Sequence, residues 1–189
     1  RSIYFDSSSH LYYGAFLEST GVHVYDTGFI QQAVIPTSVI NNYYNYGATV
    51  DTKITKDGSG RFWTTGWKVH IMLPGNKKFE LIEKQFPSLA WLGAEDRFID
   101  IVTTRNGNIL VKKNDGTIYH INHTTLVADT ISCQEIKDEG VEIKNASAWY
   151  DKKRDMVYLI RNGGIGQYNL AKQEMKIILN IFLWHLHIT

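Results

Sequence analysis

The chain has 189 residues, a length that fits one ordinary domain around one hydrophobic core. Hydrophobic residues make up 43% and charged residues 21% of the chain, which excludes a disordered protein. No apolar stretch reaches the roughly 20 residues that a membrane-spanning helix needs, so we expect no insertion into a membrane. Twenty Lys and Arg against 19 Asp and Glu leave a net charge of +1, and we therefore expect no nucleic-acid partner.

Cysteine and aromatic content narrow the class further. Cys133 is the only cysteine, so the chain cannot form an internal disulfide or a zinc site built from several thiolates. Aromatic residues reach 13%, with 11 Tyr, while the chain has 15 Gly and only 3 Pro. This balance is typical of many short strands joined by tight turns.

An internal repeat organises the sequence. Four segments share an apolar run, a polar turn and three further strand-like runs, and the third run starts at Val22, Val69, Ile118 and Ile165, in steps of 47, 49 and 47 residues. Turns of the type I′ hairpin class are predicted at Asn106-Gly107, Asp115-Gly116 and Asn162-Gly163. Four strands per unit at this period predict an all-β fold, a four-bladed β-propeller with four antiparallel strands per blade.

The expected blades cover 1–46, 47–95, 96–142 and 143–189 of a single domain, 1–189. Short helical turns are predicted between blades, at 35–46, 85–95 and 133–142, and Pro87 fits a helix start. A helical repeat is disfavoured because runs such as 117–121 are short and rich in β-branched residues. A fragment of a larger propeller, with six to eight blades, is the alternative fold.

Several short motifs resemble the hemopexin-like repeat, a family of four-bladed propellers. Val50-Asp51-Thr52-Lys53 and Ile99-Asp100-Ile101-Val102 resemble the opening strand of its blades, and Phe86-Pro87-Ser88-Leu89 resembles its blade junction. Many extracellular members close the ring with a disulfide, which Cys133 cannot form alone. The chain is therefore more similar to disulfide-free members such as plant seed albumins. Ring closure would then depend on strand pairing and packing, with the tail 180–189 as a candidate cover for an exposed edge.

Two histidines occupy the same place in consecutive repeats. His23 and His70 each lie between apolar neighbours in the third strand of blades one and two, and Tyr119 and Gly166 take that place in blades three and four. They are the candidate cofactor ligands, for haem or a metal. The alternative is a pair of strand histidines that face solvent or a neighbouring blade, because equivalent residues of different blades are separated by a blade angle.

The innermost strands suggest an ion site on the propeller axis. Their carbonyl groups converge near the axis, and four near-equivalent acceptors suit a hard cation. The expected ligands are the strand starts near Ser2, Asp51, Asp100 and Ser147, acting mainly through backbone oxygens. The family resemblance also implies an axial ion, and we expect calcium or sodium.

No catalytic motif appears, so we expect a protein that is not an enzyme. The run from Asp57 to Trp63 is similar to the Asp-box of sialidase-type propellers but fits a hairpin turn better. The leading hypothesis is a module that binds a small molecule, a glycan or a protein. A lectin-like propeller is the alternative, with Trp63, Trp67 and Trp149 stacking on sugar rings or else packing inside blades; a glycosidase is third. We expect a monomer or weak dimer, secreted or in a storage compartment rather than cytoplasmic.

Overall fold

A computed structural model describes residues 2–15, 21–36, 53–65, 68–93, 98–113, 117–131, 147–161 and 164–180. In these ranges the strands form four separate sheets of four antiparallel strands each. Among these residues no helix has the length and apolar character needed to cross a bilayer.

Each sheet is built from four consecutive strands. Blade 1 holds β1 (Ser2–Asp6), β2 (Leu11–Ala15), β3 (Gly21–Tyr25) and β4 (Gln31–Pro36). Blade 2 holds β5 (Ile54–Lys56), β6 (Phe62–Thr64), β7 (His70–Met72) and β8 (Glu80–Leu81). Blade 3 holds β9 (Phe98–Thr103), β10 (Ile109–Lys113), β11 (Ile118–Ile121) and β12 (Ala128–Ile131). Blade 4 holds β13 (Ser147–Asp151), β14 (Met156–Arg161), β15 (Gly164–Asn169) and β16 (Glu174–Asn180).

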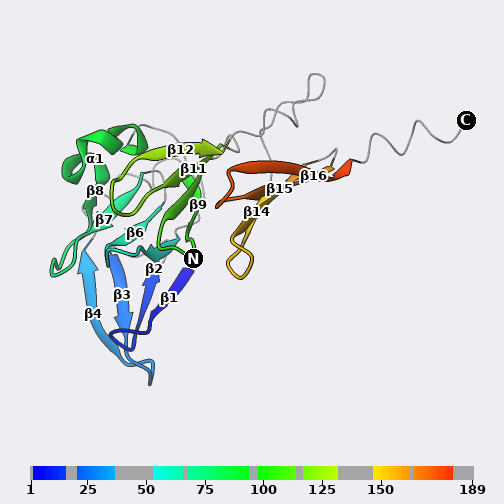
Figure 1. The fold of residues 1–189 in the computed structure, drawn as a ribbon. Helices are drawn as coiled ribbons and strands as arrows, with labels where there is room; N and C mark the ends of the chain where they lie inside the picture. Colours follow the sequence, from blue (N-terminus) through cyan, green and yellow to red (C-terminus); the bar gives the residue numbers. More distant parts are fainter. Residues whose placement is uncertain are drawn as a thin grey trace, which may run out of the picture.

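The strand order confirms the propeller prediction. Within every sheet the strands neighbour one another in chain order, as a meander does, and the first strands β1, β5 and β9 contact one another in turn. Each sheet lies inside one of the four predicted blade ranges. Figure 1 shows the sheets following one another along an arc, with blade 1 in blue at one end and blade 4 in orange at the other.

A short helical segment connects blade 2 to blade 3. It consists of α1 (Ile82–Gln85) and the 3₁₀ segment η2 (Pro87–Gly93), so the predicted helical turn at 85–95 and the predicted start at Pro87 are confirmed. The helical turn predicted at 35–46 does not begin at Ile35, because Ile35 and Pro36 end strand β4; its other residues, and the turn predicted at 133–142, lie outside the described residues.

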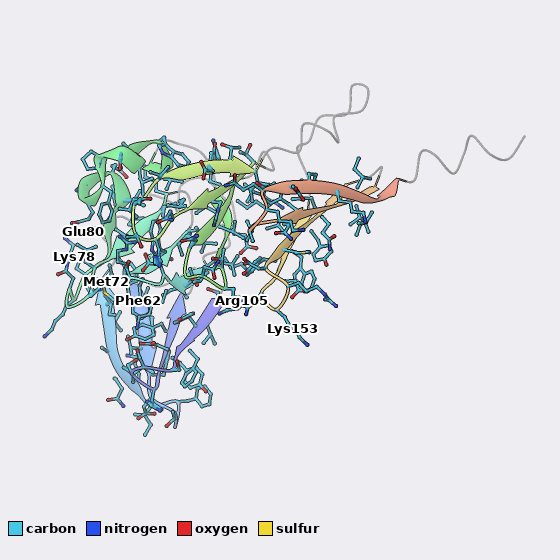
Figure 2. The ribbon with its side chains drawn as sticks, in the orientation of Figure 1. Phe62, Met72, Lys78, Glu80, Arg105 and Lys153 are labelled. Atoms are coloured by element: carbon cyan, nitrogen blue, oxygen red, sulfur yellow. The ribbon has the colours of Figure 1, made fainter. Side chains whose placement is uncertain are left out.

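The core lies between blades rather than within them. Because side chains alternate along a strand, each sheet presents one face to the preceding blade and one to the following blade. Three clusters of buried residues fill the resulting interfaces. Blades 1 and 2 enclose Tyr13, Val22, Val24, Ile54, Phe62, Met72 and Phe79. Blades 2 and 3, with the segment between them, enclose Trp63, Val69, Ile71, Ile82, Leu89, Leu92, Ile101, Ile109, Val111 and Ile121, and blades 3 and 4 enclose Leu110, Ile118, Ile131, Val157, Leu159 and Leu170. Figure 2 shows Phe62 and Met72 at the first of these junctions.

The turn at Asn106-Gly107 forms where it was predicted, but its type differs. Gly107 has a positive φ of 81° and Asn106 is not among the residues with positive φ, whereas a type I′ turn needs both. The Gly107 amide instead donates to the Thr104 carbonyl, and the Thr104 amide donates to the Asn108 carbonyl. A three-residue loop with glycine at the left-handed position results, and Gly60 repeats it in blade 2 with the same φ. The predicted turns at 115–116 and 162–163 lie outside the described residues.

Polar contacts at these turns link consecutive blades. Lys56 Nζ lies 2.9 Å from the Asp6 carboxylate, which joins blade 2 to blade 1. Thr103 Oγ1 donates to the Lys56 carbonyl at 2.6 Å, which joins blade 3 to blade 2. The Arg105 amide donates to Tyr150 Oη at 2.6 Å, which joins blade 3 to blade 4. Within the described ranges, by contrast, no buried hydrophobic cluster joins blade 4 to blade 1. Cys133 and residues 181–189 of the tail lie outside those ranges.

Candidate functional site

A pocket of about 330 Å³ lies at the outer side of blades 2 and 3, where η2 meets the hairpin formed by β11 and β12. Figure 1 shows the helical segment after β8 close to β12. The volume lies at the lower end of the range of small-molecule sites and suits a ligand of monosaccharide size. The lining residues are Ser88, Leu89, Trp91, Tyr119, Thr125, Leu126, Val127, Ala128 and Thr130.

Two aromatic rings in contact with each other line the pocket. The ring centroids of Trp91 and Tyr119 are 4.3 Å apart, with the ring planes tilted by 50°. Leu89 and Leu92 are almost fully buried in the core between blades 2 and 3, so η2 is anchored through them. Trp91 packs against the same core but stays only half-buried. The same core therefore holds the indole in place and leaves part of it open to the pocket.

The rim comes from the connection between β11 and β12. The Asn122 carboxamide oxygen accepts hydrogen bonds from the backbone amides of Thr124 and Thr125, at 2.8 and 2.9 Å. The Leu126 amide donates to the Asn122 carbonyl, and Leu126 has a positive φ of 59°, which a leucine adopts only when its surroundings impose it. The Asn122 amide in turn donates to the Val127 carbonyl. These bonds fix the loop before any ligand arrives, which lowers the entropy cost of binding.

The chemistry of the lining favours a neutral, hydroxyl-bearing ligand. The described lining residues supply three aliphatic hydroxyls, from Ser88, Thr125 and Thr130, and the phenol of Tyr119, and none of these described residues carries a carboxylate, ammonium, guanidinium or imidazole group. Tyr119 pairs directly with Thr130 across the strands, so their polar groups lie on one face. Aromatic faces with hydroxyl donors and acceptors beside them bind rings that have an apolar face and polar edges.

The structure does not bring the two predicted cofactor histidines together. His70 lies on the face of blade 2 that packs against blade 1, is 7% exposed, and its Nε2 has no hydrogen-bond partner among the described residues. Burial lowers the pKa of His70 to about 4, against the opposing effect of a backbone hydrogen bond with Lys68. His23 lies on the other face of blade 1, where its Nδ1 is 2.9 Å from Gln31 Oε1. The sheet of blade 1 separates the two imidazoles, so one haem or one metal ion cannot use both.

Of the predicted axial ligands, Ser2 and Ser147 begin their strands and Asp100 is the third residue of β9, and the side chains of Ser2 and Asp100 have other partners. Ser2 Oγ accepts a hydrogen bond from the Ile54 amide at 2.8 Å, across the interface between blades 1 and 2. Asp100 Oδ1 accepts from the adjacent Ile101 amide at 2.9 Å. Ser147 begins β13 through main-chain pairing, and Asp51 lies outside the described residues.

The charge next to Asp100 disfavours a cation there. Lys112 pairs with Asp100 across the strands, and although burial lowers the pKa of Lys112, the Asp100 carboxylate acts to raise it. Among the described residues no three His, Cys, Asp or Glu side chains gather as a metal site. A ring of backbone carbonyls is a different kind of site, so the axial calcium or sodium ion stays a prediction, which a calcium-dependent rise in melting temperature would test.

The tryptophans predicted to stack on sugars have different environments. Trp63 is fully buried, and its Nε1 donates to the Asp57 carboxylate at 2.8 Å, so Trp63 packs inside the blades and cannot reach a ligand. Trp149 is 59% exposed and contributes to the lining of a small pocket between blades 3 and 4, together with Val102 and Leu110. Trp67 lies outside the described residues. Trp91 lines the larger pocket between η2 and the hairpin of β11 and β12. The sequence did not single out Trp91, because its role depends on the packing of an inter-blade segment against another blade.

Comparisons with known proteins find similarity of fold only. No protein-family model matches the chain, and no curated protein matches it. The extracellular domain of BT3049, described as a hybrid two-component system of B. thetaiotaomicron, is 16% identical with a TM-score of 0.62, over 95% of this chain and 23% of that one. The dihydro-heme d1 dehydrogenase NirN, in complex with DHE, is 11% identical with a TM-score of 0.59, over 93% of this chain and 36% of NirN. An auxiliary nutrient binding protein from Bacteroides thetaiotaomicron is 12% identical with a TM-score of 0.54, over 94% of this chain and 40% of that protein.

These neighbours support the propeller architecture. The chain spans less than half the length of each of them. At these identities the likeness concerns the fold, and it does not identify the hemopexin-like family that the short motifs resemble.

Proposed function

We propose that this protein is a non-enzymatic binding module, and that the pocket between η2 and the hairpin of β11 and β12 binds a small saccharide. The observation that carries the proposal is the pair of Trp91 and Tyr119 beside three hydroxyl groups, in a lining whose described residues are all uncharged. A sugar ring presents an apolar C–H face to such an aromatic surface and exchanges hydrogen bonds with the hydroxyls.

The lining also favours binding over catalysis. Glycoside hydrolysis commonly uses two carboxylic side chains beside the scissile bond, and the lining residues within the described ranges supply none. The fold neighbours include extracellular domains of signalling systems and a nutrient-binding protein, as well as one dehydrogenase. The extracellular domains and the nutrient-binding protein support a role in ligand capture outside the cytoplasm.

Glycan-array screening followed by titration calorimetry tests the proposal. We expect at least one mono- or oligosaccharide to bind, and Trp91→Ala to weaken that binding by about tenfold or more, because the stacking surface is lost. Trp149→Ala is the matched control, since it removes an exposed tryptophan outside the pocket and leaves the Kd for the sugar unchanged. Binding that survives Trp91→Ala, or that Trp149→Ala abolishes, would contradict this location of the site. A chain that binds no glycan would contradict the ligand class.

A further inference from the structure

The two hairpin connections of blade 3 lie at the same end of its sheet. One residue from each strand forms the last row of that sheet: Thr103, Ile109, Ile121 and Ala128. The turn 104–108 and the loop 122–127 both follow this row, and the His123 amide donates to the Asn108 carboxamide oxygen at 3.0 Å. Neighbouring strands are about 4.8 Å apart, so the centres of the two connections are about 10 Å apart. The rim of the pocket and the turn 104–108 therefore belong to one surface.

A hydrogen-bonded tyrosine extends this surface to blade 4. The Tyr150 hydroxyl accepts a hydrogen bond from the Arg105 amide at 2.6 Å and donates to the Asp155 carboxylate at 2.7 Å. Asp155 is the last residue of the turn 152–155 between β13 and β14, so these two bonds join the turns of blades 3 and 4. Figure 2 shows Arg105 and Lys153 on these turns, on the same side of the molecule.

The carboxylates of the blade 4 turn bind groups of the protein itself. Asp151 is 7% exposed, and its carboxylate accepts hydrogen bonds from the amides of Lys153 and Arg154 and from Arg154 Nη1. Asp155 is half-buried and accepts the hydrogen bond from Tyr150. Both acidic groups are therefore shielded from solvent, and they hold the backbone of the turn in one conformation.

Three cations of these turns remain exposed. Arg105, Lys152 and Lys153 lie at the surface, and none of their charged groups forms an ion pair with the part of the chain that the structure describes. They lie at the ends of the strands, whereas neighbouring blades pack against the faces of a sheet. An arginine binds an anionic group through two parallel hydrogen bonds, and a lysine binds it as a point charge. The three side chains thus form a surface for an anionic ligand.

We propose that the ligand of the pocket is an acidic oligosaccharide. One uncharged ring lies between η2 and the hairpin of β11 and β12, and carboxylate or sulfate groups of further units bind Arg105, Lys152 and Lys153. This inference rests on the proposed saccharide function and adds the class of saccharide. The juxtaposition that carries it is an uncharged pocket beside exposed cations on one surface, whose parts are joined by hydrogen bonds through His123 and Tyr150.

Paired glycan probes give the first test. Tetrasaccharides of hyaluronan, chondroitin sulfate and gellan contain both neutral and acidic units, and each is compared by calorimetry with its carboxyl-reduced, desulfated counterpart. At about 50 mM NaCl at least one acidic probe should bind about tenfold tighter than its neutral counterpart, and this preference should shrink at about 500 mM NaCl, because salt screens exposed charges. If no acidic probe is preferred, the inference is overturned, while a neutral glycan bound in the pocket leaves the proposed function standing.

Removal of two cations tests the role of the turns. Arg105→Gln combined with Lys153→Gln should weaken binding of the acidic probe by about tenfold and leave the Kd of the neutral counterpart unchanged. Lys77→Gln combined with Lys78→Gln is the matched control, because it removes two exposed lysines from the turn between β7 and β8. Figure 2 shows Lys78 away from Arg105 and Lys153, and the control should change neither Kd. An acidic probe that binds the first double variant as tightly as the wild type overturns the inference.

Trp91→Ala separates a failure of the inference from a failure of the pocket. It should weaken the acidic probe and its neutral counterpart alike, since both place a ring on the indole. If the acidic probe depends on Arg105 and Lys153 but not on Trp91, the turns bind an anion without the pocket. That result overturns the inference and also contradicts the pocket as the saccharide site. Circular dichroism of each variant verifies that its blades remain folded.

Discussion

Ile3 and Ile54 occupy the same position on the same face of consecutive blades, yet Ile3 is 63% exposed and Ile54 is 6% exposed. The difference arises from the neighbouring sheet, because blade 1 covers the face of blade 2 and no described residues cover the face of blade 1. A comparison of variants at Ile3 and Ile54 therefore reports how much an inter-blade interface contributes to stability.

Truncating each isoleucine to alanine should separate the two environments. Ile54→Ala is expected to lower the free energy of unfolding by about 2–5 kcal/mol, since it leaves a cavity between blades 1 and 2. Ile3→Ala should change it by about 0.5 kcal/mol or less, because most of the Ile3 side chain is exposed. Urea unfolding of both variants provides the comparison, and equal losses would show that the exposed face is packed in solution.

Gly107 approaches the neighbouring blade closely. A Cβ atom at Gly107 would lie 2.6 Å from Gly58 Cα of blade 2, and the φ of Gly107 is +81°. Gly107→Ala should therefore destabilise the protein by more than the roughly 1 kcal/mol that a left-handed alanine costs. Gly75→Ala is the matched control, because Gly75 has the same φ but nothing within 4 Å of the added Cβ. Similar melting temperatures for the two variants would mean that the contact between blades 2 and 3 tolerates the methyl group.

Asp57 organises the turn of blade 2. Its buried carboxylate accepts hydrogen bonds from the backbone amides of Ser59 and Arg61, from Arg61 Nε at 2.6 Å and from Trp63 Nε1. Asp57→Ala should cost about 3–5 kcal/mol, because it leaves the buried Arg61 guanidinium without its counter-charge.

An exposed aspartate provides the comparison for Asp57. Asp26 accepts two backbone amides in a similar turn but lies near the surface, so Asp26→Ala should cost only about 1 kcal/mol. Chemical denaturation of the two variants measures the difference. A loss of equal size would show that the Asp57 network contributes no more than a surface turn.

Stability should fall between neutral pH and pH 4 because of His70. Burial lowers the pKa of His70 to about 4 in the folded protein, against 6.5 for an exposed histidine, so the unfolded chain binds the proton more tightly. The contribution of neutral His70 to the free energy of unfolding is complete above pH 6.5. It is lost as the pH falls towards 4, by up to about 3 kcal/mol. The charges that act on His70 are Glu83, which raises its pKa, and Lys68, which lowers it.

Urea unfolding measured from pH 7.5 to pH 4 checks this dependence. His70→Leu should flatten the curve by about the amount that His70 contributes, whereas His23→Leu should leave the curve as steep as in the wild type. A wild-type curve that rises as the pH falls from 6.5 to 4 would contradict the neutral, buried imidazole.

The repeat made most of the fold predictable. The spacing of Val22, Val69, Ile118 and Ile165 located the third strands, and Pro87 located a helix start, because alternation and turn residues are local signals. The type of the turn at Asn106 was not predictable, since the neighbouring blade constrains Gly107. Trp91 and the pocket were missed for a related reason: the residues that meet there come from η2 and from a later hairpin, and no local pattern records that contact.

The most direct test of the proposed function is to follow the indole N–H signals of the five tryptophans by NMR while the sugar found on the array is added. The Trp91 signal, assigned from its absence in Trp91→Phe, should move with a titration curve that matches calorimetry. The signals of Trp63 and Trp149 should stay where they are. A shift at Trp149 or at Trp63 with an unchanged Trp91 signal would contradict the pocket between η2 and the hairpin of β11 and β12 as the binding site.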